Sequence, residues 1–379
     1  MRISVNELDR VIDQTVRPHA VRVDASGEFP KASLDALAAS GVMGLPMAES
    51  VGGGGGELAD AVTVIRTLAG ACGSTAMIVL MHYTAATVID RHGPDEVKKA
   101  IAAGEHLSTL AFSESGSRSQ FWVPLGTATA SVSGRVCLDA DKSWITAAGE
   151  ADSYVWSSRP LAADAAGPMT LWLVPAGAAG LSAAGAFDGL GLRGNASAPL
   201  TADGVLLPLS AMLGADGGGL DLALASILPC FLICSAAMSA GLIRRLATET
   251  AGHLQRTRLA HLGVSLAQQA GPRAQLARLQ IEADRTWAHI SDALSAVEDG
   301  RPDATLLVLE VKAAAGEAAA EAADLALRAG GGAAFRKESV VERLFRDSQA
   351  ARVMAPTTDA LHDFVGRALC GLPLLGDVA

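Results

Sequence analysis

The sequence predicts a mainly helical α+β fold in which one β domain separates two helical domains. Apolar residues recur every three or four positions near both ends of the chain, a spacing typical of amphipathic helices. Between these parts, short runs rich in Thr, Ser, Val and Trp are broken by Gly and Pro, which indicates strands. With 379 residues, half of them hydrophobic, the chain can bury a large layered core. We place the domains at residues 1–106, 107–215 and 216–379.

The first domain is expected to be all helical, with Gly and Pro between the helices. A run of glycines at Gly52–Gly56 could suggest a phosphate loop, but it lacks the Lys-Ser/Thr pair that grips a nucleotide and no strand precedes it. We therefore interpret it as a turn. The predicted helices are Leu8–Arg17, Lys31–Ser40, Glu57–Leu68, Ala71–Ile89 and Asp95–Ala103.

The middle domain is expected to be built from short strands, because its residues alternate between polar and β-branched or aromatic types. The predicted strands are Thr127–Ser131, Val136–Asp139, Ser153–Ser158, Met169–Val174 and Gly204–Pro208. Long Ala/Leu-rich helices follow, and Gly330–Gly332 interrupts them. These helices are Leu220–Gln255, Leu266–Val297, Ala304–Ala329 and Thr358–Leu369.

The run Leu222–Ile243 carries no charge and is long enough to span a bilayer. Pro229 and three serines interrupt it, and no second such run exists, so we expect a buried central helix and no membrane partner. The N-terminus has no apolar signal segment, and five cysteines without metal-like spacing favour a reducing cytoplasm and no metal. A net charge of −10 without a basic stripe argues against nucleic acid.

Motifs at the joints between these domains resemble the acyl-CoA dehydrogenase superfamily, whose members bind FAD. GVMGLPMAESVGG at Gly41–Gly53 is similar to a Gly-rich stretch in that family's first domain. SESGSRSQ, within Gly104–Phe121, is similar to its Thr-Glu-Pro-Gly-x-Gly-Ser-Asp signature, although three positions depart. Hydroxyls and amides of that signature bond the flavin, so the resemblance implies FAD contacts for Ser113 and Ser119.

ADKSWITAAGEADSY, Ala140–Tyr154, resembles a more specific family motif. The resemblance implies that the Trp144 ring lies beside the isoalloxazine and that Thr146 hydrogen-bonds near its N5. The residue types suit that chemistry, because a Trp excludes water from a reducing flavin and a hydroxyl tunes the ring. GLGLRGNASAPL, Gly189–Leu200, resembles the closing strand of the same domain.

In the last domain, RAGGGAAF at Arg328–Phe335 stands where the family has a Gly-rich turn against the adenine half of a partner's FAD. Gly331 and Gly332 would permit that approach, because Gly has no Cβ. VERLFRDSQAARVMAPTTD, Val341–Asp359, follows with the family's spacing and retains its flavin-contacting Thr as Thr357. The resemblance implies a helical N-terminal domain, a β-barrel or sandwich and a C-terminal four-helix bundle, assembled as a homodimer or homotetramer.

A family arginine that reaches the FAD pyrophosphate across the dimer interface has two candidates in RTRLAHLG, Arg256–Gly263. In the family, two residues separate this arginine from a Phe-Gly pair. Arg256 has that spacing if Leu259-Ala260 replaces Phe-Gly. Arg258 is followed by Leu262-Gly263, but three residues separate them instead of two. Either guanidinium suits a phosphate, so both remain candidates. Gln269 is the candidate for the family's nearby glutamine.

The family's proton-abstracting carboxylate is missing. In typical members it stands nine residues after the arginine that Arg346 matches, and Ala355 occupies that position here. Other members place the base on the central helix, where the alignment gives Phe231 and Leu232. None of these side chains can accept a proton. The sequence therefore assigns no catalytic residue.

Three functions remain open. The leading one is FAD-dependent α,β-desaturation of an acyl thioester, linked to CoA or to a carrier protein, with a base from another position. The second is a flavin-dependent monooxygenase, a C- or N-hydroxylase on the same fold, which needs no such base and takes another small-molecule substrate. The third is a non-catalytic subunit of a heteromeric dehydrogenase. An electron acceptor or a flavin reductase is the expected redox partner.

Overall fold

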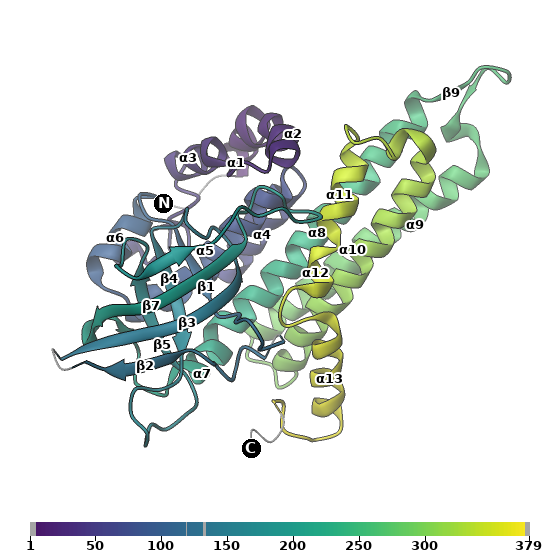
Figure 1. The fold of residues 1–379 in the computed structure, drawn as a ribbon. Helices are drawn as coiled ribbons and strands as arrows, with labels where there is room; N and C mark the ends of the chain where they lie inside the picture. The colour runs from purple at the N-terminus through teal and green to yellow at the C-terminus, as the bar shows by residue number, and fades with distance from the viewer. Residues whose placement is uncertain (1–4, 119, 132–133, 376–379) are drawn as a thin grey trace. The chain divides into compact units, whose positions relative to one another are not determined.

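The computed structural model describes residues 5–118, 120–131 and 134–375, which run through helices, strands and helices again (Figure 1). This order confirms the predicted mainly helical α+β fold. Contacts group the chain into two compact units, which are described separately below. The first takes Met1–Val64, Met77–Asp188 and Arg193–Phe231, and the second takes Ile65–Ala76, Gly189–Leu192 and Leu232–Ala379.

The N-terminal part is helical as predicted, but its first helical run is longer than expected. The prediction ended at Arg17, whereas the chain stays helical to Ser26: a π turn at Ile12–Val16 directly precedes α2, whose first turn contains Pro18. Gly27 then ends the run with a left-handed φ of 70°. The elements are α1 Val5–Val11, η1 Ile12–Val16, α2 Arg17–Ser26, α3 Lys31–Ala39, η2 Glu49–Val51, α4 Leu58–Ala69, α5 Gly73–His92 and α6 Asp95–Ala102.

Two four-stranded sheets form the β domain. Their strand orders are β1-β4-β5-β8 and β2-β3-β7-β6, and β1 pairs with β4 in parallel while the other pairs are antiparallel. Side chains of both sheets meet in one core, in which Trp156 and Trp172 are fully buried. The strands are β1 Ser108–Ala111, β2 Thr127–Ala130, β3 Arg135–Ile145, β4 Ser153–Ser158, β5 Thr170–Pro175, β6 Leu181–Ala183, β7 Ala198–Pro208 and β8 Met212–Leu213.

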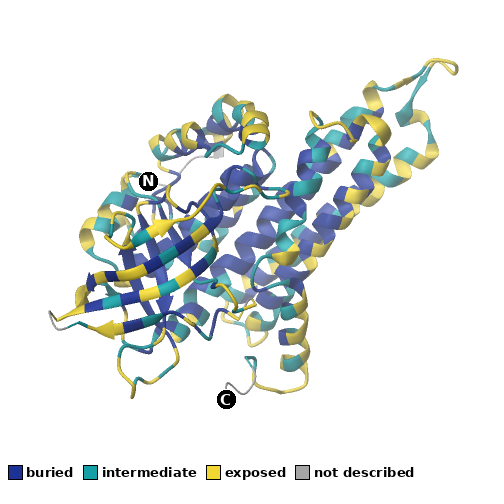
Figure 2. Cartoon of the chain, in the orientation of Figure 1, coloured by how far each residue is buried: buried dark blue, intermediate teal, exposed yellow. Residues whose placement is uncertain are grey.

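Strand β3 is longer than its predicted core of Val136–Asp139. Buried and exposed side chains alternate along it and along β7 (Figure 2), as expected for sheets with one face on a core. Its second half contains the charged residues Asp141 and Lys142, which interrupt the strand pattern in the sequence. The pairing with β7 also shifts register twice, the second time between Lys142 and Ile145.

The C-terminal part is a set of packed helices. α8, α9, α10 and α11 share one core, in which small alanines of α10 such as Ala319 and Ala323 pack against Leu279 of α9. The sequence did not predict the hairpin of two-residue strands β9 and β10 or the short helices α11 and α12. The elements are α7 Gly219–Leu222, η4 Ala223–Ile227, α8 Leu228–Arg256, β9 Arg258–Leu259, β10 Val264–Ser265, η5 Leu266–Gln268, α9 Ala270–Glu298, α10 Ala304–Ala334, α11 Val340–Ser348, α12 Ala350–Val353 and α13 Thr358–Leu369.

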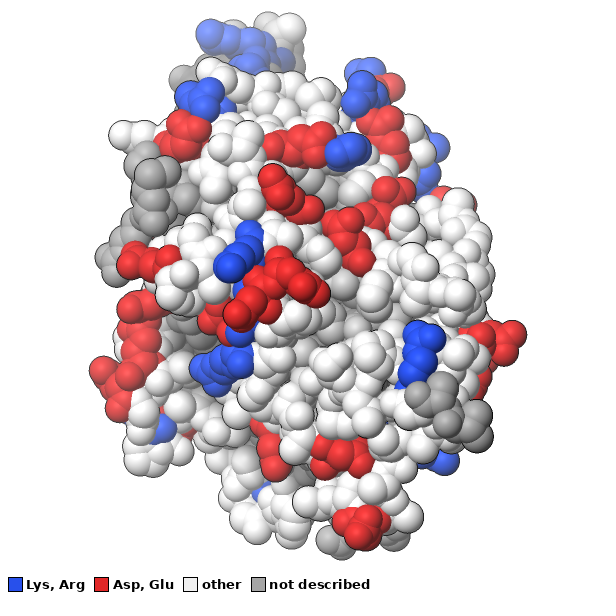
Figure 3. All heavy atoms as spheres, turned by 90° about the vertical axis from the view of Figure 1, so that its left-hand side faces the viewer, with Lys and Arg blue, Asp and Glu red and all other residues white. Residues whose placement is uncertain are grey.

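The apolar run that resembled a membrane span belongs to the helix Gly219–Arg256. Among the described residues it is the one helix long and apolar enough to cross a bilayer, and 67% of its most apolar window is buried inside the protein. Burial of this kind is what a core helix shows. On the face drawn in Figure 3, basic side chains stand among acidic ones and do not join into a stripe.

Candidate functional site

Trp144 lies near the end of β3 in an unusual backbone conformation. Its φ is 58°, in the left-handed region that a bulky residue rarely adopts. The register shift at this point turns the indole outward, so that 72% of Trp144 is exposed while the next residue, Ile145, is buried. Strained backbone that presents a large apolar ring to water does not help the fold. Trp144 therefore marks a candidate binding surface.

Thr146 follows this bulge and is positioned by the loop that leads into β7. It is buried, and its Oγ1 lies 3.4 Å from the Ser197 Oγ. The next residue, Ala147, is also left-handed with a φ of 57° and donates its N–H to the Asn195 carbonyl at 2.9 Å. The loop thus fixes the hydroxyl that the family resemblance assigns to the flavin.

Ser113 stands beside this bulge in the same unit. Its carbonyl accepts the Ser143 N–H at 2.9 Å, which ties it to the residue before Trp144, and its side chain is half-buried. The structure therefore brings together Ser113, Trp144 and Thr146, three of the predicted flavin-binding residues. Ser119, another of them, lies outside the described residues.

A buried ion pair that the sequence interpretation did not assign holds this region together. Lys142 Nζ donates to Glu114 Oε1 at 2.8 Å, and both side chains are almost fully buried. Nζ also donates to the carbonyl and hydroxyl of Ser157, while Glu114 accepts the N–H of Gly126. Burial lowers the pKa of Lys142, and Glu114 partly offsets that shift. The pair fixes the segment that carries Ser113 onto β3.

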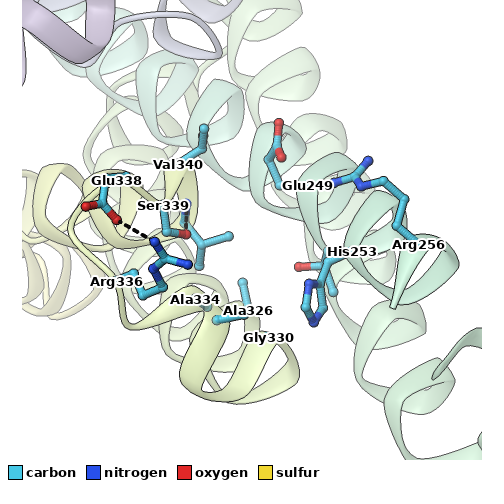
Figure 4. A pocket seen from close by; sticks show the side chains of 13 residues that line it. Glu249, His253, Arg256, Ala326, Gly330, Ala334, Arg336, Glu338, Ser339 and Val340 are labelled. Carbon is cyan, nitrogen blue, oxygen red and sulfur yellow. Dashed lines mark hydrogen bonds and ion pairs between the residues drawn. The ribbon is translucent and has the colours of Figure 1, made fainter. Parts of the chain in front are cut away.

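The second unit contains a cavity of about 360 Å³ between α8, the end of α10 and the start of α11 (Figure 4). Arg256 lines it, and among the described residues this guanidinium has no hydrogen-bond or ion-pair partner. Thr250 also lines it, buried and with no partner for its hydroxyl in the described structure. The Gly-rich turn contributes Gly330. The cavity thus offers a free cation and a free hydroxyl to a ligand.

Of the two arginine candidates, the structure places only Arg256 in this cavity. Arg258 begins the exposed hairpin strand β9, and Gln269 precedes α9; neither lines the cavity. Gly331 does not line it either, but it lies next to Gly330 and has a φ of 54° and a ψ of −146°, which needs a glycine and kinks α10. Gly332 follows it on the exposed surface.

Family comparisons cover nearly the whole chain. The models for the acyl-CoA dehydrogenase N-terminal, middle and C-terminal domains match residues 3–104, 109–205 and 217–370. The chain belongs to the acyl-CoA dehydrogenase family. A short-chain specific acyl-CoA dehydrogenase of Clostridium acetobutylicum is 23% identical over 352 residues, which cover 92% of each chain.

Solved structures of the same fold include two kinds of protein. Butyryl-CoA dehydrogenase from Megasphaera elsdenii has a TM-score of 0.89 at 21% identity and 96% coverage of both chains. KijD3, solved in complex with FMN and a dTDP-linked amino sugar, has a TM-score of 0.86 at 21% identity and covers 97% of this chain and 93% of its own. At this identity both show the fold alone.

As a member of the acyl-CoA dehydrogenase family, the chain is a FAD-dependent oxidoreductase. Its residues fit that cofactor. Trp144 offers an exposed aromatic face, and the cavity of the second unit offers an unpaired guanidinium at Arg256 and an unpaired hydroxyl at Thr250. An aromatic surface suits the flavin ring, and a guanidinium with a hydroxyl suits phosphate or sugar oxygens.

The acyl-CoA dehydrogenase base has no substitute at the expected positions. Phe231 and Leu232 are both buried and apolar on α8, and Ala355 follows α12. Among the described carboxylates only Glu114 and Asp347 are buried. Glu114 is bound to Lys142, and Asp347 accepts the N–H of Leu192 at 2.7 Å, so both carboxylates are engaged in structural hydrogen bonds.

Histidine does not replace that carboxylate from the buried helix α5. His82 is fully buried, its Nδ1 accepts the Ser108 N–H at 3.1 Å and its Nε2 donates to the Met43 carbonyl at 3.0 Å. Burial lowers its pKa to about 4, so the ring is neutral at physiological pH. Both nitrogens are used, and His82 serves to join α5 to the neighbouring segments of its unit.

Proposed function

We propose that this chain oxidises a small-molecule substrate with FAD without a carboxylate that removes a substrate proton, and that oxygenation is the reaction it fits best. The observation that carries this proposal is the apolar set at Ala355, Phe231 and Leu232. A general base supplies on the order of 10²- to 10⁴-fold in rate, so thioester desaturation without one would be slow. A flavin monooxygenase on this fold does not need that base.

The proposed flavin contacts belong to two FAD molecules. In the first unit, Trp144 would cover the isoalloxazine, with Thr146 and Ser113 as hydrogen-bond partners. In the second unit, Arg256 would bind the phosphates of a partner subunit's FAD, and the Gly331–Gly332 turn would lie against the adenine of that FAD. When bound, FAD supplies the electron transfer, and once reduced it reacts with oxygen.

Thr357 is the remaining predicted contact. Its Oγ1 accepts the N–H of Ala360 at 3.3 Å and so caps α13. A hydroxyl that accepts from the backbone still has its own proton to donate. Thr357 therefore keeps a hydrogen bond available for the flavin, as the family resemblance implies.

Desaturation of an acyl thioester is the second candidate. It is favoured by the curated relative from Clostridium acetobutylicum, which is named a short-chain specific acyl-CoA dehydrogenase and matches along 92% of its length. It requires a base from a position that neither the sequence nor the structure identifies. KijD3, solved with a nucleotide-sugar ligand, is an example of this fold that binds a molecule that is not a thioester.

The decisive experiment restores the missing carboxylate. The purified chain and its Ala355→Glu and Ala355→Gln variants are mixed anaerobically with a panel of acyl-CoA thioesters while the flavin band near roughly 450 nm is recorded. We expect bleaching with Ala355→Glu alone, because Gln has the same size but accepts no proton. Reduction by a flavin reductase, followed by oxygen-dependent turnover, would then support the unmodified chain as an oxygenase.

Other outcomes point elsewhere. Bleaching of the unmodified chain by any thioester would overturn the oxygenase proposal and establish a dehydrogenase with a relocated base. Failure of the chain to retain flavin when purified alone would favour a non-catalytic subunit that pairs with an active homologue. We further propose that the active form is a cytoplasmic homodimer or homotetramer supplied by an electron acceptor or a flavin reductase.

A further inference from the structure

A buried lysine on α10 holds the segment that contains Ala355. Lys312 is only 1% exposed. Its Nζ donates to the backbone carbonyls of Ala351 at 3.1 Å, Met354 at 2.9 Å and Pro356 at 2.6 Å. An ammonium group has three N–H donors, so all of them are used. The two shorter bonds reach the residues on either side of Ala355.

The charge of Lys312 has no carboxylate partner among the described residues. Burying an unpaired ammonium costs several kcal/mol unless other groups compensate. Burial accordingly lowers its pKa to about 7, and no neighbouring charge contributes to that shift. Glu317 of α10, Arg352 of α12, and Asp359, His362 and Asp363 of α13 are exposed, and Glu310 of α10 is half-buried beside His289 of α9.

An uncharged side chain would fill this space with a smaller loss of solvation free energy. The ammonium group therefore does more than fill space. Carbonyls at the C-terminal end of a helix have no partner within the helix and carry partial negative charge. Ala351 and Met354 lie at the end of α12, and Pro356 begins the turn into α13. Lys312 thus connects three carbonyls that no regular element could satisfy.

We propose that Lys312 is a positioning residue: its ammonium group fixes the backbone of residues 351–356 and thereby places Ala355 and Thr357. Thr357 follows this segment directly and is the N-cap of α13. The part of this inference that concerns the flavin and substrate rests on the proposed function. The part that concerns the backbone does not, because the three hydrogen bonds lie within one unit of the chain.

Hydrogen–deuterium exchange of the full-length chain tests this role without cofactor or substrate. The informative peptide contains Met354, whose N–H donates to the Ala350 carbonyl at 3.0 Å. We expect exchange at least about tenfold faster in Lys312→Met than in the unmodified chain, which corresponds to a loss of about 1.4 kcal/mol. Lys337→Met, at an exposed lysine of the same unit, is the matched control and should leave this peptide unchanged.

Two more variants separate the ammonium from mere filling of space. Lys312→Gln keeps two N–H donors without charge and should exchange at an intermediate rate, whereas Lys312→Arg keeps charge and donors and should restore protection.

Equal exchange in the unmodified chain and a folded Lys312→Met variant would overturn the proposal, because it would make Lys312 a space-filling residue. If Lys312→Met does not fold, unchanged exchange in Lys312→Gln would overturn it in the same way. These outcomes are independent of thioester bleaching by Ala355→Glu. Loss of protection together with an unchanged flavin response would keep the backbone role and overturn only the link to the proposed function.

Discussion

The two buried lysines of this molecule occupy contrasting environments. In the β domain, Lys142 donates to a carboxylate, Glu114, so its charge is neutralised at 2.8 Å. In the helical unit, Lys312 donates only to backbone carbonyls, and its charge stays uncompensated. Both are shielded from water, and burial lowers the pKa of both. The two lysines therefore differ in their acceptors: Lys142 has a carboxylate, and Lys312 has backbone carbonyls alone.

That contrast separates a region that matches the family from one that departs from it. Lys142 fixes the segment that leads to Trp144 and Thr146, residues that match the family pattern. Lys312 fixes the segment in which the family's carboxylate is replaced by Ala355. Hydrogen bonds from a buried lysine thus support both the segment before Trp144 and the segment around Ala355. The family's carboxylate is missing from the second segment. The proton chemistry can therefore differ while the backbone around it stays supported.

Breaking the neutralised pair should have the largest effect. Glu114→Gln leaves Lys142 as an uncompensated buried charge, which is expected to lower the free energy of unfolding by about 3–5 kcal/mol. Urea denaturation measures this change. Asp35→Asn is a matched control, because it removes the carboxylate of an exposed pair with Lys31 and should leave stability unchanged. Equal stability of both variants would contradict the role assigned to the pair.

The pH dependence of Lys312 should have the next largest effect. Its pKa is about 7 in the folded chain, below its ordinary value of 10.5, so between these pH values the unfolded state binds more protons. Stability relative to Lys312→Met should therefore rise with pH across that window, by up to about 1.4 kcal/mol per pH unit. Denaturation at pH 7, 8 and 9 measures the slope. A flat or falling difference would show that the pKa is not lowered.

Arg256 extends the comparison to a cation with no acceptor in the described structure. Arg256→Ala should not weaken folding, but loss of a charge-assisted hydrogen bond to phosphate should weaken FAD binding by about 1.5–3 kcal/mol, or roughly ten- to a hundredfold. Equilibrium dialysis of FAD measures this loss. Arg258→Ala is the control, since Arg258 does not line the cavity. Weaker binding in Arg258→Ala alone would reverse the assignment.

The fold was predictable because its signals are long. The helix–strand–helix order follows from hydrophobic periodicity over many residues. The apolar run Leu222–Ile243 predicted a buried helix, and most of this run lies in α8. Short or charged elements were missed. Two-residue strands at β9 and β10 leave no periodic pattern. The charged second half of β3 pairs with β7 through two register shifts, which interrupt the alternation that a strand prediction relies on.

The candidate site was predictable only in part, because residue type does not reveal burial. Trp144 was recognised from its motif, but its left-handed backbone follows from a register shift that no local pattern shows. No motif in the sequence singles out Lys312, which lies in an Ala-rich helix. A signal was present: Leu309 and Gly316, three and four residues away on the same helical face, are both buried. A charge within an apolar stripe is a candidate for a buried cation.

The bulge at the end of β3 also gives the protein an optical property. The chain has five tryptophans; Trp122, Trp156 and Trp172 are buried, and Trp287 lies half-buried beneath the Arg66 guanidinium. Trp144 alone among them presents most of its surface to water. Fluorescence from a water-facing indole is red-shifted, and a flavin that stacks on it accepts its excitation energy. The emission spectrum of the unlabelled chain therefore reports directly on whether this one strand end is covered.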